Sequence, residues 1–407
     1  MRKKFALVFN ARAGLARPRL LDGVLVVLKD AGADVFQVPA RSAEEASMRV
    51  AALAGQRGAD AVIAAGGDGT FRAVATGAAD TELPVGFIPL GTGNILAYEI
   101  GIRKRAAELA RGLLENPAIP VRGGLVNGAA FFLIVGAGFD AAIVRGLNYK
   151  TKRLIARAAY TSPFVKTILR GSDMFDVEVD GRAFEASWVI VTRASHYGGS
   201  FVLTRETQLG ASGMIAVVFE SQSRAALLVA ATALGLGRLV NPATRPRGVT
   251  VLQASRVLIG KNTKVPVQVD GDESGTTPVD VSAAGPVVRV IVPVSYVAEL
   301  TNRHTNHVLS DVLGVVGREL RRVSLQHSAS VRVRPKGDAL DFSEPGPNGL
   351  AVGFEKRTAA MDRAARGSAV QAPAQHPHVP VQTHPHLRFS FRFVIADVSE
   401  PVCWHYA

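Results

Sequence analysis

The first 120 residues alternate between short apolar runs and stretches with a helical hydrophobic period, and this alternation limits the chain to a few folds. Apolar runs typical of buried strands occupy residues 5–9, 34–38, 61–65 and 85–88, and helical patterns occupy residues 19–31 and 43–56. A further helix is expected to begin at Thr70. Because strands that alternate with helices form parallel sheets covered on both faces, the pattern predicts an α/β domain with a doubly wound parallel sheet over residues 1–120.

After residue 120 the strand-like runs become frequent and the helical patterns rare. The runs lie at residues 131–135, 174–179, 188–192, 214–219, 256–259, 266–269 and 287–292, and the helical patterns lie near residues 152–170 and 224–236. This composition predicts a second, antiparallel β-rich domain over residues 121–298. We expect the active site in a cleft between the two domains.

The composition changes again in residues 299–407. Eight of the nine histidines lie beyond residue 300, together with a stretch rich in proline and histidine at residues 371–378. Few periodic apolar runs occur there, which predicts a disordered tail. The alternatives are an extension that is not native to the fold and a metal-binding tract formed by His376, His378, His384 and His386.

The formal net charge of +13 favours anionic partners such as nucleotide phosphates or an acidic membrane surface. Aromatic residues make up only 6% of the chain, and no basic stretch is interleaved with them, which argues against a nucleic-acid partner. The single cysteine, Cys403, excludes an intramolecular disulfide and favours a reducing, cytoplasmic location. Whether the chain forms a homodimer stays open.

Membrane contact is expected to be peripheral. The longest nearly uncharged apolar stretch, residues 225–237, has about 13 residues, whereas roughly 20 are needed to span a bilayer. A basic cluster in and before the helical pattern at residues 152–170 is either a solvated helix face or a docking surface for anionic lipid headgroups. It consists of Arg145, Lys150, Lys152, Arg153, Arg157, Lys166 and Arg170.

Two glycine-rich turns follow neighbouring apolar runs of the first domain. The first turn contains Gly66, Gly67, Asp68, Gly69 and Thr70, and the second contains Gly91, Thr92, Gly93 and Asn94. Glycines let backbone amides approach anionic oxygens closely, threonine hydroxyls add donors, and ligands of such sheets bind at the carboxyl ends of the strands. The turns therefore predict a phosphate site with one carboxylate in it. The other interpretation is that these residues serve only the geometry of the connections.

Taken in order, the motifs resemble those of the diacylglycerol kinase catalytic family, which includes bacterial lipid kinases and sphingosine kinases. The resemblance covers residues 1–298 and rests on residues 10–14, the two glycine turns, residues 136–141, residues 197–199 and residues 268–272. It implies a lipid kinase that transfers the γ-phosphoryl group of ATP to the hydroxyl of diacylglycerol or a related lipid. Because no lysine-containing phosphate loop is present, Mg²⁺ is an implied cofactor. An NAD kinase-like enzyme and a catalytically silent nucleotide- or lipid-binding protein are the alternatives.

The resemblance also implies roles for individual residues. The nucleotide would be bound by Asn10, Gly66, Gly67, Gly69, Thr70, Gly91, Thr92 and Asn94. Asp68 would be the catalytic base, and Asp272 would be a second catalytic residue that helps to bind the metal or to orient the acceptor, unless residues 270–272 form only a hairpin turn. The chain departs from the family pattern at Ala11, Ile95 and Ser212, and these departures leave the metal ligands and the lipid substrate undetermined.

Overall fold

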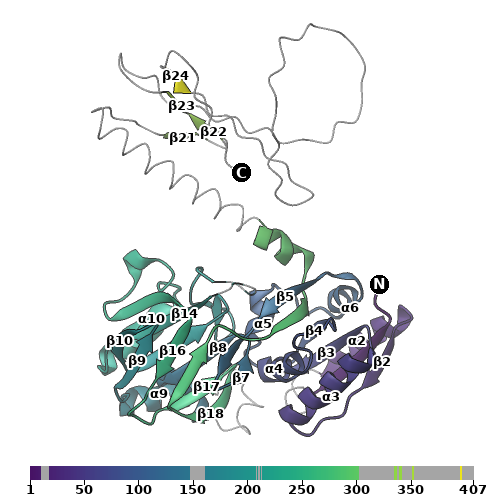
Figure 1. Ribbon diagram of the computed structural model, residues 1–407, viewed down its shortest axis with the longest axis horizontal. Helices are drawn as coiled ribbons and strands as arrows, with labels where there is room; N and C mark the ends of the chain where they lie inside the picture. The colour runs from purple at the N-terminus through teal and green to yellow at the C-terminus, as the bar shows by residue number, and fades with distance from the viewer. Residues whose placement is uncertain are drawn as a thin grey trace. The chain divides into compact units, whose positions relative to one another are not determined.

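The computed structural model describes residues 1–10, 18–146, 161–207, 209, 211 and 213–301, together with four short strands beyond them (Figure 1). Residues 1–301 form one compact unit. In the second unit, β21 (Arg334–Lys336) pairs antiparallel with β22 (Ala339–Asp341), and β23 (Ala351–Val352) pairs antiparallel with β24 (Ile395–Ala396). Several sequence predictions lie outside the described residues: those for residues 11–14, for Ser212, for the four tail histidines, and for Lys150, Lys152, Arg153 and Arg157 of the basic cluster.

The first six-stranded sheet confirms the predicted α/β fold. Its order is β2 (Asp34–Gln37), β1 (Lys4–Phe9), β3 (Ala61–Gly66), β4 (Val85–Pro89), β20 (Val287–Ile291) and β5 (Ala118–Arg122). Neighbouring strands run parallel except for β5, which is antiparallel to β20, so the sheet is mixed. The prediction that residues 287–292 belong to the β-rich domain is wrong. A buried apolar strand has the same sequence pattern in either sheet, so the sequence does not distinguish the two.

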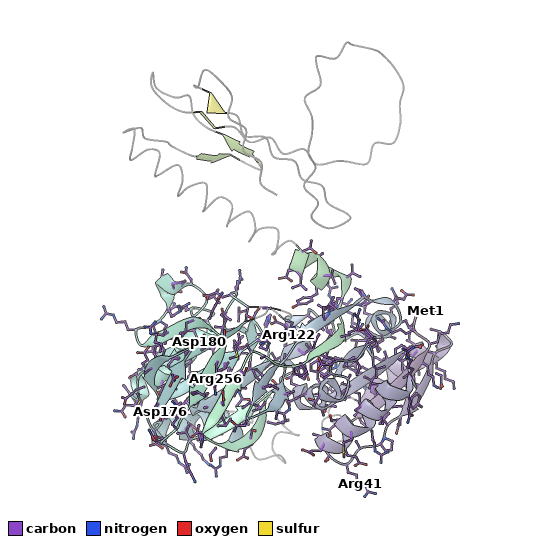
Figure 2. All side chains as sticks on the ribbon, viewed as in Figure 1. Met1, Arg41, Arg122, Asp176, Asp180 and Arg256 are labelled. Carbon is purple, nitrogen blue, oxygen red and sulfur yellow. The ribbon has the colours of Figure 1, made fainter. Side chains whose placement is uncertain are left out.

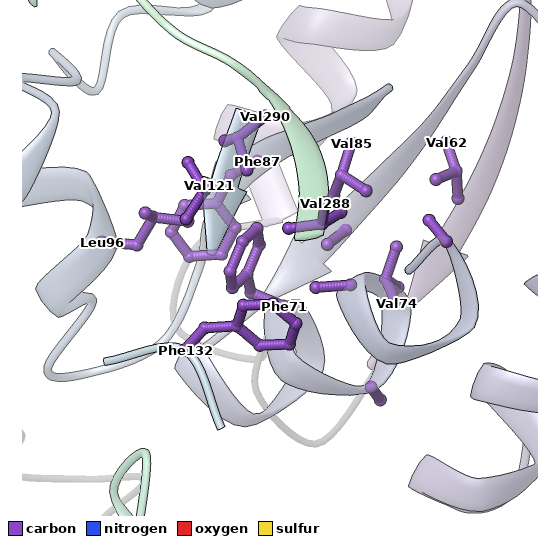
Figure 3. Close-up of a cluster of buried hydrophobic side chains, with 14 of the residues drawn as sticks. Val62, Phe71, Val74, Val85, Phe87, Leu96, Val121, Phe132, Val288 and Val290 are labelled. Carbon is purple, nitrogen blue, oxygen red and sulfur yellow. The ribbon is translucent and has the colours of Figure 1, made fainter. Parts of the chain in front are cut away.

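Helices cover both faces of this sheet. On one face, α3 (Ala43–Gln56) and α4 (Asp68–Gly77) pack against each other over a core that contains Phe71, whose ring meets those of Phe87 and Phe132 edge-on at 5.8 and 5.9 Å (Figure 3). On the other face, α2 (Pro18–Asp30) and α6 (Ala106–Glu115) pack over a core made mostly of leucine, isoleucine and alanine side chains. The side chains of β1 alternate between these two cores, as a strand buried on both faces requires.

The other two six-stranded sheets are antiparallel and form the predicted β-rich part. The first has the order β10 (Arg182–Ala186), β9 (Phe175–Val179), β16 (Arg256–Ile259), β19 (Val279–Ser282), β6 (Gly124–Val126) and β7 (Ala129–Phe131). The second, here called the central sheet, has the order β15 (Val249–Ala254), β14 (Met214–Phe219), β11 (Trp188–Thr192), β8 (Ile134–Gly138), β17 (Pro266–Val269) and β18 (Asp272–Thr276). Valines of both sheets form a shared core, and Figure 2 shows Asp176, Asp180 and Arg256 among the side chains of this part.

A layer of helices covers the opposite face of the central sheet. It contains α7 (Phe139–Arg145), α9 (Thr161–Arg170) and α10 (Arg224–Gly235). Trp188 stacks on Phe219 with ring centroids 4.0 Å apart and forms the centre of the core beneath these helices. Its neighbour Val189 points to the other face of the sheet, into the core shared with the second antiparallel sheet.

Candidate active site

The two glycine turns meet at the carboxyl ends of β3 and β4. The amides of Leu90 and Gly91 donate to the carbonyl oxygen of Gly66 at 2.8 and 3.1 Å. A Cβ on Gly91 would lie 2.7 Å from Gly67 Cα, so the backbones approach each other as closely as glycine allows. The second turn is held further by Asn94, whose side-chain amide donates to the carbonyl of Gly91 at 2.6 Å. The predicted residues of both turns thus lie together.

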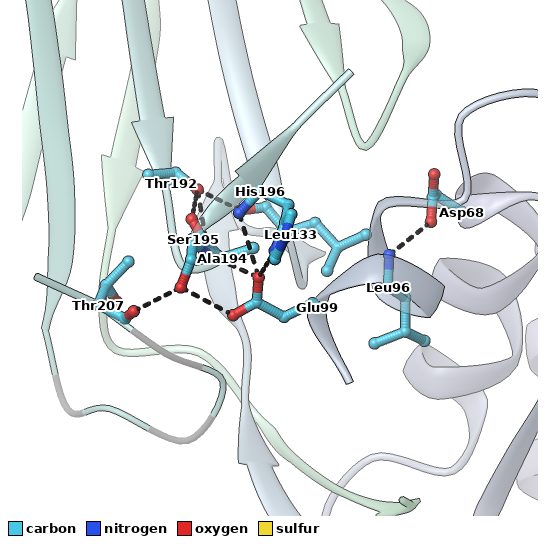
Figure 4. Close-up of polar contacts among 9 residues, drawn as sticks. All are labelled: Asp68, Leu96, Glu99, Leu133, Thr192, Ala194, Ser195, His196 and Thr207. Atoms are coloured by element: carbon cyan, nitrogen blue, oxygen red, sulfur yellow. Dashed lines mark hydrogen bonds and ion pairs between the residues drawn. The ribbon is translucent and has the colours of Figure 1, made fainter. Parts of the chain in front are cut away.

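Asp68 links the two turns. It is the first residue of α4, and its carboxylate accepts the amides of Ile95 at 2.9 Å and of Leu96 at 3.2 Å (Figure 4). These amides open the short helix α5 (Ile95–Glu99), which has no side-chain cap of its own, so Asp68 supplies the missing acceptors. Burial raises the pKa of Asp68 to about 7, although the two amide hydrogen bonds oppose the rise. Its proton affinity therefore matches neutral pH.

Asn10 and Thr70 lie beside the first turn. The side-chain amide of Asn10, which follows β1, donates to Thr70 Oγ1 at 3.3 Å. Thr70 lies in the first turn of α4, where the amides of Asp68 and Gly69 have no intrahelical acceptor, so this end of the helix favours an anion. Thr92, half-buried, lies between Gly91 and Asn94 in the second turn. Every residue predicted to bind the nucleotide is thus in or next to the paired turns.

The sequence allowed two interpretations of residues 270–272, namely a hairpin turn and a site role for Asp272. The two are compatible. Asp270 and Gly271 connect β17 to β18 with φ values of 50° and 84°, the left-handed backbone that a tight hairpin turn requires. Asp270 is buried, and its carboxylate accepts the amides of Phe132, Leu133 and Ile134. Asp270 is therefore a structural acid, and its burial raises its pKa.

Asp272, by contrast, reaches the first glycine turn. A Cβ on Gly69 would collide with the Asp272 carboxylate, and Arg72 Nη2 lies 3.6 Å from Asp272 Oδ2. The side chain of Asp272 is 46% exposed, so its oxygens are accessible to a ligand. Arg72, which the sequence analysis did not single out, lies one helical turn after Asp68 and also donates to the carbonyl of Val269. It adds a positive charge where the hairpin meets α4.

A buried cluster behind this hairpin was also missed as a functional unit. Gln268 accepts the amide of Gly271 at 2.9 Å through Oε1 and donates through Nε2 to Asp140 Oδ2 at 3.2 Å. Tyr197 donates its hydroxyl to the same carboxylate oxygen at 3.1 Å. Burial raises the pKa of Asp140 to about 7, although hydrogen bonds to its carboxylate, those from Gln268 and Tyr197 first among them, oppose the rise. Three separate family motifs therefore converge on one carboxylate.

The C-terminal end of α5 is also held by hydrogen bonds. Glu99, buried, accepts the amides of Ser195 and His196 at 2.9 and 3.1 Å and lies 2.8 Å from His196 Nδ1 (Figure 4). α5 thus joins the glycine turns to the loop that follows β11. One feature of the sequence points to this loop, because His196 is the only histidine before residue 300.

The carboxylates of the site fit a metal ion that is held mainly by phosphate. Within the described part of the chain, no group of three or more His, Cys, Asp or Glu side chains converges as a metal site. The oxygens of Asp68 and Asp270 accept backbone amides, whereas Asp272 is accessible beside the anion-favouring end of α4. Mg²⁺ commonly binds through one or two carboxylates together with substrate phosphates, and Asp272 would be the accessible carboxylate beside an ion held in this way by phosphate.

The same domain pair occurs in known proteins. Residues 4–126 match the diacylglycerol kinase catalytic domain family, and residues 133–292 match the YegS C-terminal NAD kinase beta sandwich-like domain family. A diacylglycerol kinase of Bacillus subtilis (strain 168) is 27% identical over 284 residues, which cover 68% of this chain and 92% of that protein. A diacylglycerol kinase of Staphylococcus carnosus (strain TM300) is 23% identical over 287 residues, which cover 68% and 91%.

A solved structure shares the fold. It is described as a diacylglycerol kinase from Bacillus anthracis str. Sterne, and it superposes with a TM-score of 0.54 at 18% sequence identity, covering 72% of this chain and 98% of that one. At this identity the likeness concerns the fold alone.

Proposed function

We propose that this chain, which belongs to the diacylglycerol kinase catalytic-domain family, transfers the γ-phosphoryl group of ATP to the hydroxyl of diacylglycerol or a related lipid alcohol. The observation that carries the proposal is the meeting of three segments: the two glycine turns and the hairpin that presents Asp272 to Gly69. The turns offer amides to phosphate, and the hairpin offers a carboxylate to the acceptor.

The nucleotide phosphates would bind at the first turn of α4. The amides of Asp68 and Gly69 and the hydroxyl of Thr70 are the donors there, and Arg72 adds positive charge. Mg²⁺, when bound with ATP, would be held mainly by the phosphate oxygens and would neutralise the charge that develops on them, with Asp272 nearby. In the reaction, the acceptor oxygen bonds to the γ-phosphorus while the bond to the bridging oxygen of ADP breaks.

Two carboxylates are candidates for taking the proton of the acceptor hydroxyl. Asp68, the residue that the sequence favours, has a suitable pKa, but protonating it would weaken a hydrogen bond to Ile95 or Leu96. Asp272 is more exposed, and Arg72 is its ion-pair partner among the described residues. We therefore assign proton uptake to Asp272 and assign to Asp68 the task of holding the second turn against the first.

Incubation with γ-labelled Mg-ATP and diacylglycerol vesicles tests the proposal, with label in the lipid as the expected result. Asp272→Asn should lower kcat about 10²- to 10⁴-fold, the usual contribution of a positioned base, and should leave the Kd for ATP within about twofold. Label in NAD instead of lipid would point to the NAD kinase-like alternative. Bound ATP with no transfer to either acceptor would point to a silent binding protein.

A second variant separates the two acids. If Asp68 is the base, Asp68→Asn abolishes turnover while the Kd for ATP stays normal. If Asp68 holds the turns together, the same change weakens ATP binding as well. A normal Kd in an inactive Asp68→Asn protein, together with an active Asp272→Asn protein, would overturn our assignment.

A further inference from the structure

Helix α10 has an outward face that is largely apolar. Its sequence after Arg224 contains no charged residue. The inward face buries Leu227 and Leu234 in the core around Trp188. On the opposite side, Leu228 and Val229 are 48% and 54% exposed. The outward face of a surface helix is ordinarily polar, so within the described structure α10 leaves an apolar face uncovered.

Helix α9 extends this face. Phe164 and Ile168 of α9 pack on the same core over the central sheet as α10 does, and the two helices are in contact. Their outward sides therefore point away from the same face of the sheet. Val165 and Leu169, one helical turn apart on the outward side of α9, are 48% and 61% exposed.

The exposed apolar residues of the described chain concentrate here. Phe201 in β13 (Phe201–Val202), which packs beside α10, is also exposed, and so is Leu236, which follows α10. We call this set the apolar face, and it holds six of the twelve exposed large apolar residues in the described part of the chain. Its members are Val165, Leu169, Phe201, Leu228, Val229 and Leu236. Such a concentration marks an interaction surface.

Positive charges lie beside the exposed apolar residues of both helices. Lys166 and Arg170 are exposed on α9, Arg224 begins α10, and Arg238 lies exposed just past its end. Residues 161–170 and 221–248 contain no aspartate or glutamate. A second copy of the chain, docked by twofold symmetry, would bring this positive surface against itself, which is unfavourable. A bilayer with anionic headgroups offers acyl chains to the apolar side chains and phosphates to the cations.

We propose that the apolar face of α9, α10 and β13 inserts into the headgroup region of an anionic bilayer, with α10 lying in the plane of the membrane. The inference depends on the proposed function in one respect only: membrane docking would bring the active site to a substrate that is dissolved in the membrane. None of the described helices combines the length and the apolar character that crossing a bilayer requires. The 12 residues of α10 extend about 18 Å, against a hydrocarbon core of about 30 Å.

Vesicle co-sedimentation without nucleotide tests the inference. The full chain is mixed with vesicles of phosphatidylcholine, with and without phosphatidylglycerol. We expect the wild type to bind the anionic vesicles and the double variant L228S/V229S to bind them at least tenfold more weakly. R224A and R238A should each lower binding about fivefold at low salt and little at high salt. The matched control is V26S/M48S, which removes two apolar side chains of α2 and α3 that are at least as exposed as Leu228 and Val229, and it should bind as the wild type does.

Wild-type binding by L228S/V229S, or an equal loss in V26S/M48S, would overturn the inference. A wild-type dimer that L228S/V229S converts to a monomer, with vesicle binding unchanged, would assign the face to a second copy instead. Failure of the proposed function is distinguishable, because the sedimentation assay involves no turnover. Vesicle binding through α10 without phosphorylation of any lipid refutes the kinase and leaves the membrane surface in place.

Discussion

Asp68→Asn should make the free energy of unfolding less dependent on pH, and the structure fixes the sign. Burial raises the pKa of Asp68 from 3.8 to about 7. A folded-state pKa above the unfolded value stabilises the fold at low pH, and this contribution is lost as pH rises from about 4 through about 7. The two pKa values differ by about 3, and at about 1.36 kcal/mol per pH unit the loss amounts to roughly 4 kcal/mol.

Asparagine cannot ionise, so the variant lacks this loss. The amide also offers one acceptor oxygen to Ile95 and Leu96, where the ionised carboxylate offers two. The pKa of about 7 already includes the effect of these two hydrogen bonds, so they add no further pH dependence. Relative to wild type, the variant should therefore gain roughly 4 kcal/mol between about pH 4 and about pH 8.

Urea unfolding, followed by the fluorescence of the buried Trp188 at several pH values, measures this difference. Asp60→Asn is the control, since amide hydrogen bonds from Lys3 and Lys4 lower the pKa of Asp60. Its contribution is lost only as pH falls below about 4, so above about pH 5 the control curve should run parallel to that of wild type. Parallel curves for wild type and Asp68→Asn across the whole range would refute the reasoning.

Three further predictions concern the turns, the buried cluster and the tail. Gly91→Ala places a methyl group 2.7 Å from the backbone of the first turn and should weaken ATP binding at least about tenfold by calorimetry, whereas Gly93→Ala, with its nearest contact at 3.5 Å, should not. Gln268→Leu removes the link between the hairpin and Asp140 and should lower kcat about tenfold with the KM for ATP unchanged; an unchanged kcat would make the link purely structural. Removal of residues 302–407 should leave kinase activity intact, and an inactive but folded truncation would contradict our assignment of the site to the first unit.

The sequence predicted the strands and the glycine turns because both are local patterns. The apolar runs became β1, β3 and β4, and the turns after β3 and β4 met because parallel strands end at the same edge of a sheet. The same local reading failed for β20. Which sheet a buried strand joins depends on contacts between residues 85 and 290, and no window of sequence records such a contact.

The sequence identified Asp68 and Asp272 as candidate site residues, but it did not predict how they are arranged. Asp68 and Asp272 stood out beside glycines, yet nothing local indicates that Asp68 would cap α5 while Asp272 would reach Gly69. Glu99 and Gln268 are ordinary polar residues in sequence. Their importance arises only from burial beside partners almost 100 or more residues away.

The position of β20 has a consequence for how the protein is made. Residues 287–291 form an inner strand of the first six-stranded sheet, between β4 and β5, although they are the last strand of the first unit to leave the ribosome. Before these residues are made, the position between β4 and β5 is unfilled, and the second glycine turn follows β4. The sheet that carries the glycine turns is therefore complete only after residue 291 has been made, and a fragment ended near residue 120 would expose the edge of β4 to unwanted pairing.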